Sequence, residues 1–160
     1  MEYLKNPTTK KAVFMAGWRD EETKNFVTFD GLNDKFGRNK FELSLLRNYW
    51  KGIKTPIEFP EINILLPATT ILPNVNLSYH AVIRQNNQWQ MMQDLHHLEF
   101  TWVLVKNDVY GNPLSMKYLG ESNSVSFKAP GYAKNYRICL YVFNGKEVQI
   151  INSKLNPDLN

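Results

Sequence analysis

Three groups of side chains in this sequence carry functional groups that enzymes and metal sites use. They are the acid run Asp20-Glu21-Glu22, the histidine pair His96-His97 and the single cysteine, Cys139. Two well-placed carboxyl groups can exchange protons with a substrate. Histidines can ligate zinc, and a thiolate can act as a nucleophile.

The spacing of each group favours a structural explanation. Consecutive acids in the charged segment RDEETKN are typical of a solvated loop. Adjacent histidines point in different directions, so they chelate poorly. Cys139 lies in the apolar run RICLYVF, which predicts a buried thiol. We therefore predict no catalytic residues, no metal and no cofactor; an acid pair of Asp20 with Asp30 is the enzymatic alternative.

Aromatic side chains offer a different chemistry, because the C–H faces of sugars stack on aromatic rings. Trp89 lies in the amide-rich segment NNQWQ, Tyr110 in the turn sequence DVYGN, and Trp18 at the end of an apolar run. These three residues are the candidates for sugar contact. Each could also be a partly buried packing residue. Trp50 and Trp102 lie on apolar faces, and we expect both in the core.

The elements that would position these residues differ between the two parts of the chain. After residue 61 the sequence predicts six or seven short strands separated by turns, with the strongest at residues 136–143 before Asn144-Gly145. Alternation places Leu77, Tyr79, Ala81 and Ile83 on one strand face. This pattern predicts a mainly β protein with a β-sandwich.

In the first 55 residues, the sequence predicts a strand at residues 12–18 and a helix from Asn39 to Lys51. Asn39 and Glu42 have the spacing of a capping box, and Gly52 and Pro56 favour an end to the helix. We expect Leu45, Leu46 and Tyr49 to pack against the sandwich or the N-terminal strand. The prolines and glycine of residues 51–61 indicate a connector, so we expect domains at 1–55 and 56–160.

Composition and charge limit the classes of partner that we expect for this protein. The 160 residues carry a net charge of +4, with acids interleaved among the bases. A dense basic stripe, which nucleic-acid binding favours, is absent. No apolar run is long enough for a membrane span, and residues 1–11 do not form a signal peptide. We expect neither nucleic acid nor membrane as partner, and the localisation is undetermined because an export signal could lie upstream.

Two stretches resemble known families. Three segments resemble the immunoglobulin-like sandwich domains of polysaccharide-active enzymes: EFTWVLVKNDVYGNPL, GESNSVSFKAPG and NYRICLYVFNGKEVQIINSKLNP. Polycystic-kidney-disease-type and fibronectin-type modules share this order of segments. The segments AVFMAGWRDE and FVTFDGLNDKFGRNKFELSLLRNYW resemble the last unit of a glycosidase (β/α)₈ barrel. In that family the last strand often ends in a Trp at the sugar site, and Trp18 matches it. The carboxyl pair of such glycosidases comes from earlier strands, which this sequence does not contain.

Together these observations predict an immunoglobulin-like antiparallel β-sandwich preceded by a short strand-plus-helix segment. The expected function is that of a non-catalytic accessory domain of a carbohydrate-active protein. Such a domain would bind or position polysaccharide, or act as a scaffold for a neighbouring catalytic domain. The alternative is a protein–protein interaction module that uses a sheet edge or the helix face, and a homodimer is one form of it.

Overall fold

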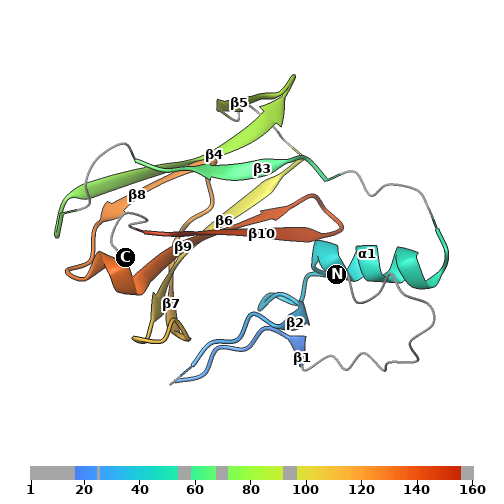
Figure 1. The fold of residues 1–160 in the computed structure, drawn as a ribbon, viewed down its shortest axis with the longest axis horizontal. Helices are drawn as coiled ribbons and strands as arrows, with labels where there is room; N and C mark the ends of the chain where they lie inside the picture. Colours follow the sequence, from blue (N-terminus) through green and yellow to red (C-terminus); the bar gives the residue numbers. More distant parts are fainter. Residues whose placement is uncertain (1–16, 25, 54–58, 68–71, 92–96, 156–160) are drawn as a thin grey trace.

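A computed structural model describes residues 17–24, 26–53, 59–67, 72–91 and 97–155. The chain is mainly β and forms three layers (Figure 1). An outer sheet packs on a central sheet, and the N-terminal segment, residues 17–53, packs on the other side of the central sheet.

The outer sheet is built around one long strand, β4 (Asn76–Gln85). On one side β4 pairs with β3 (Ile62–Leu65). The first half of β4 also pairs with β8 (Ser124–Lys128), and the second half pairs with β5 (Gln88–Met91). Asn86 and Asn87 form the β4–β5 turn with φ of 50° and 62°. Asparagine tolerates this left-handed conformation, and such a turn matches the twist of a two-residue hairpin.

The central sheet has the order β10-β9-β6-β7, and all its neighbours are antiparallel. Its strands are β6 (Glu99–Asn107), β7 (Pro113–Gly120), β9 (Tyr136–Phe143) and β10 (Val148–Lys154). A short 3₁₀ turn, η2 (Ala133–Asn135), leads into β9. Gly145, with φ of 84°, makes the tight connection to β10 that Asn144-Gly145 predicts.

The main core lies between the two sheets. Trp102 on β6 is fully buried, as its alternating pattern predicts, and its Nε1 donates to the Ser122 carbonyl at 2.7 Å. Tyr79 on β4 stacks on Phe127 with ring centroids 5.7 Å apart. Burial of Leu77, Tyr79, Ala81 and Ile83 confirms the predicted inward face of β4.

The central sheet is also buried on its second face. Val103, Val105, Cys139 and Tyr141 point away from the main core, yet all four are buried. The N-terminal segment, which contains β1 (Gly17–Arg19), β2 (Gly31–Asn33) and α1 (Phe41–Trp50), covers them. Phe29 packs on this cluster, and the Phe36 ring lies edge-on to Tyr141 with centroids 6.3 Å apart. Two layers therefore enclose the central sheet, so side chains on both faces of β6 and β9 are buried.

The N-terminal segment differs from its prediction in three respects. Helix α1 exists, but Lys40 occupies the N-cap position instead of Asn39 and makes no side-chain capping bond. Of the face predicted to pack, Leu46 is buried whereas Tyr49 is half exposed. Trp50, expected in the core, is 64% exposed. Most of the predicted 12–18 strand lies outside the described residues.

Gly31 provides a test of how closely β1 and β2 approach. These strands pair in parallel, and a Cβ on Gly31 would lie 2.3 Å from the Arg19 carbonyl carbon. A Cβ on the partner glycine, Gly17, would make only ordinary contacts beginning at 3.6 Å. We expect Gly31→Ala to reduce the free energy of unfolding by about 2 kcal/mol or more. Gly17→Ala should change it by less than about 1 kcal/mol. Equal effects in urea unfolding would contradict this pairing.

Candidate functional site

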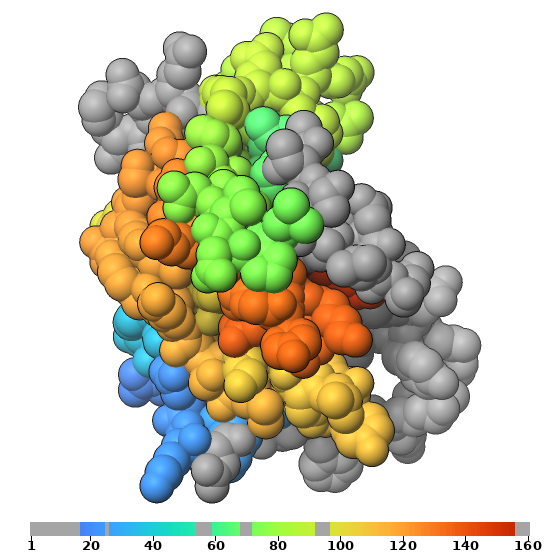
Figure 2. Space-filling view, turned by 90° about the vertical axis from the view of Figure 1, so that its left-hand side faces the viewer, coloured from blue at the N-terminus to red at the C-terminus, as the bar shows by residue number. Residues whose placement is uncertain are grey.

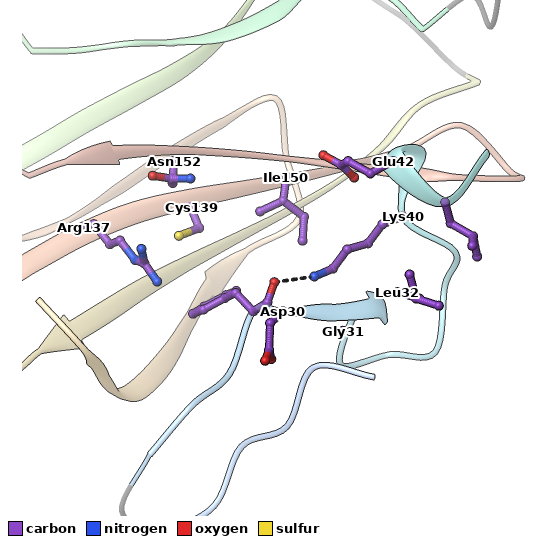
Figure 3. Close-up of a pocket in the computed structure, with 11 residues that line it drawn as sticks. Asp30, Gly31, Leu32, Lys40, Glu42, Arg137, Cys139, Ile150 and Asn152 are labelled. Atoms are coloured by element: carbon purple, nitrogen blue, oxygen red, sulfur yellow. Dashed lines mark hydrogen bonds between the residues drawn. The ribbon is translucent and has the colours of Figure 1, made fainter. Parts of the chain in front are cut away.

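A buried ion pair fastens the N-terminal segment together. The Lys40 ammonium donates to Asp20 Oδ1 at 2.7 Å and to the Phe29 carbonyl at 2.7 Å. Asp20 Oδ1 also accepts the Gly31 amide at 3.0 Å. The bond from Lys40, beside α1, to the Phe29 carbonyl is drawn in Figure 3. One charged pair thus links the end of β1, the start of β2 and the start of α1.

A second ion pair shapes the loop between β2 and α1. Asp34 Oδ1 accepts the amides of Phe36 and Arg38, and Oδ2 accepts Arg38 Nε at 2.7 Å. The Arg38 guanidinium lies 5.0 Å from the Phe36 ring centre and 5.2 Å from that of Phe143 on β9. The loop is therefore held to the central sheet by an arginine that is both ion-paired and packed on aromatic rings.

Burial and the ion pair have opposite effects on the acidity of Asp20. Burial raises the pKa of Asp20, and the Lys40 ammonium and the Gly31 amide oppose the rise. The Asp20 side chain is fully buried. In this structure the Asp20 carboxyl is ion-paired and shielded from solvent, and the Asp20–Asp30 acid pair stays a prediction.

A cavity of about 380 Å³ lies where the N-terminal segment meets the central sheet. Its lining includes Asp30, Lys40, Arg137, Cys139 and Asn152, as Figure 3 shows. Burial raises the pKa of the Cys139 thiol to about 12. The thiol therefore stays protonated at neutral pH and is a poor nucleophile.

The outer face of the outer sheet carries the first sugar-contact candidate. Trp89 lies in β5 and is 46% exposed. Its cross-strand partner is Arg84, and Met91 pairs likewise with Val82. Cross-strand partners share a face, so Trp89, Arg84 and Met91 form one outward surface. Arg84 is anchored to Glu61 at 3.1 Å.

The other two candidates lie elsewhere. Trp18 is exposed on β1 and Tyr110 is exposed on the β6–β7 turn, whereas β5 projects at the opposite side of the molecule (Figure 1). The three aromatic residues therefore do not form one binding surface. Among the described residues no group of three potential metal ligands occurs, and His96 lies outside them.

Sequence reasoning missed Lys40, Asp34 and Arg38 as organising residues. The Asp34–Arg38 spacing around Gly37 is a turn pattern that could have been used, since one carboxylate can cap such a loop. It also missed Arg84, whose alternation with the buried Ile83 predicts an outward side chain beside the hairpin turn.

Removal of the Lys40 ammonium should destabilise the folded chain, because the Asp20 carboxylate would remain buried without a cation. Lys40→Met leaves Asp20 without its cation, so we expect a loss of about 3 kcal/mol of unfolding free energy at pH 7. The pKa of Asp20 then rises further in the folded state. The folded chain holds a proton that the unfolded chain releases above about pH 4, so stability should increase as the pH falls toward that value.

The matched control is Lys35→Met, which breaks the surface pair with Glu22 at 3.3 Å. We expect a change below about 1 kcal/mol with no such pH dependence. Urea unfolding between pH 4 and 7 measures both variants. A Lys40→Met chain as stable as Lys35→Met throughout would show that the buried pair does not hold the segment.

Comparisons with known proteins found no match to this chain among family models, curated proteins or solved structures. Within the described ranges, no helix has the length and apolar character needed to cross a membrane.

Proposed function

We propose that this chain is a non-catalytic accessory domain that binds polysaccharide through the outer face of the outer sheet. The observation that carries the proposal is the half-exposed Trp89 ring on β5, beside the guanidinium-bearing Arg84. Aromatic rings at protein surfaces contribute large contact areas with little loss of conformational entropy. Sugar C–H groups can stack on such a ring while neighbouring polar groups bind hydroxyls.

The surroundings of Trp89 suit this role. Gln88 and Gln90 precede and follow it in β5 but point to the opposite face of the strand, so the polar groups nearest the ring are Arg84 and the β4–β5 turn with Asn86 and Asn87. Amides both donate and accept hydrogen bonds, which matches the hydroxyl groups of sugars. Because β5 is paired along β4, the ring is presented from a sheet and not from a free loop. A fixed platform loses less entropy on binding.

The finer assignment is part of the same proposal. Two packed antiparallel sheets are compatible with an immunoglobulin-like sandwich, and the resemblance to sandwich modules of polysaccharide-active enzymes supports an accessory role. The N-terminal segment, which resembles the closing unit of a glycosidase barrel, would then link the domain to a catalytic neighbour.

A second candidate function follows from the end of α1. Tyr49, Trp50 and Ile53 are each more than 40% exposed and lie within one turn or adjacent to it. An exposed apolar cluster of this kind favours contact with another protein surface. The alternative is therefore an interaction module, in which α1 contacts a neighbouring domain or a second copy of this chain.

The first function predicts that Trp89→Ala abolishes or strongly weakens retention on polysaccharide. Loss of a stacking ring should lower affinity about tenfold or more, equivalent to about 1.4 kcal/mol. Affinity electrophoresis against plant, bacterial and host glycans measures the effect, and Trp50→Ala is the control for loss of an exposed tryptophan. Absence of retention of the wild-type chain on every glycan would refute sugar binding.

The second function predicts the reverse pattern. Trp50→Ala should weaken self-association or binding to a covalently linked neighbour, and Trp89→Ala should leave it unchanged. Size-exclusion chromatography with light scattering, run over a concentration series, measures the oligomeric state. A wild-type chain that remains monomeric at about 100 μM contradicts the homodimer, since stable dimers associate well below that concentration.

A further inference from the structure

A polar recess of about 480 Å³ lies at the end of the central sheet. Trp89 is not among its lining residues, whereas Arg137 and Asn152 line both this recess and the cavity that includes Lys40. It is lined by the β6–β7 turn, by η2 with the start of β9, and by the end of β10. Figure 2 shows the turn and the η2 segment side by side on one face of the molecule, coloured gold and orange. Three separate segments of the chain thus form one hollow.

Three cations line this recess: Lys134, Arg137 and Lys154. The cross-strand pairing of Arg137 with Lys154 places these two charges on the same face of the sheet. None of the three forms an ion pair with any residue that the structure describes. The cations of the lining outnumber its single acid, Asp108, so an anionic ligand would relieve the repulsion between them.

The single acid of the recess lining, Asp108, offsets only one of the three positive charges. Its carboxylate accepts the Tyr110 and Asn112 amides at 2.8 Å, and the Asn112 side-chain amide at 2.9 Å. The Asn112 bonds lead the interactions that lower the pKa of Asp108. Asp108 therefore shapes the turn, and the recess keeps an excess of positive charge.

Two buried polar atoms at the recess have no protein partner among the described residues. They are Nε of Arg137, a donor, and Oδ1 of Asn107, an acceptor. Buried polar atoms are nearly always hydrogen-bonded in folded proteins. The Arg137 guanidinium is also backed by the Phe29 ring at 4.7 Å, which holds it in place. A ligand that both accepts and donates hydrogen bonds would satisfy this pair of atoms.

Exposed tyrosines lie in the two loops that form the recess. Tyr110 is 88% exposed in the β6–β7 turn, and Tyr132 is 77% exposed immediately before η2. Tyr110 is one of the aromatic residues that the sequence nominates for sugar contact. Neither exposed tyrosine lines the recess itself. Three cations and an unpaired acceptor at one recess match a sugar ring that bears an acidic group.

We propose that this recess binds the carboxylate of a uronic acid unit, so that the ligand of the domain is an acidic polysaccharide. This inference rests on the proposed polysaccharide-binding function and specifies its ligand class. The carboxylate would lie against Arg137, with Lys134 and Lys154 supplying further charge. A ring hydroxyl would donate to Asn107 Oδ1, a bond that a simple inorganic anion lacking hydrogen cannot make.

The experiment compares polygalacturonate with its methyl ester, which removes the charge and keeps the sugar. Isothermal titration at about 50 mM salt measures both polymers with wild type and with K134Q/K154Q. We expect the free acid to bind at least tenfold more tightly than the ester, and the double variant to lose about tenfold for the acid alone. The charge-matched control K128Q/K146Q, exposed lysines outside the recess, should stay within twofold of wild type.

Three results would overturn the inference. Equal binding of acid and ester would show that the carboxylate is not recognised. Equal losses in both double variants would show that only overall charge matters. Polyglutamate bound as tightly as polygalacturonate would indicate a general site for polyanions. If the ester or a neutral glycan still binds through Trp89 in any of these cases, the proposed function stands while the uronate site fails. If no polysaccharide binds at all, the proposed function fails as well.

Discussion

Val103, Val105, Cys139 and Tyr141 set the main constraint on this molecule. They belong to β6 and β9, the two middle strands of the central sheet, whose opposite face already forms the main core. Their burial from water favours the folded state only if another layer covers them. The N-terminal segment is that layer, and its position determines which surfaces remain for binding.

The covering layer has little regular structure of its own, so polar contacts hold it in place. Its backbone bonds to both edge strands of the central sheet: the Val27 amide donates to the Pro113 carbonyl on β7, and the Val148 amide on β10 donates to the Asn39 carbonyl. This blocks part of two edges that could otherwise pair with another chain. Within the layer, the buried Lys40–Asp20 pair fixes β1, β2 and α1 relative to one another, and misplacing any of them would leave a buried charge unpaired.

The strands were predictable because their patterns are local. Alternation located the inward face of β4, and Asn144-Gly145 located the β9–β10 hairpin. The covering layer was not predictable in this way. The apolar run of β9 indicates that both faces of the strand are buried, but it does not identify the part of the chain that covers the second face. Lys40 could not be recognised as the partner of Asp20, because the contact joins residues 20 positions apart in the chain. Trp50 lies on an apolar stripe, yet only part of that stripe meets the sheet.

Cys139 gives the most direct test that the N-terminal segment covers the central sheet, because it is the only cysteine and it lies beneath this layer. The measurement is the rate of thiol modification by a disulfide reagent at pH 8, in the native chain and in denaturant. A covered, protonated thiol should react at least a hundredfold more slowly in the native chain than in denaturant. A hundredfold ratio corresponds to a free energy of about 2.7 kcal/mol for the local opening that exposes the thiol. Equally rapid modification in both conditions would contradict the three-layer arrangement.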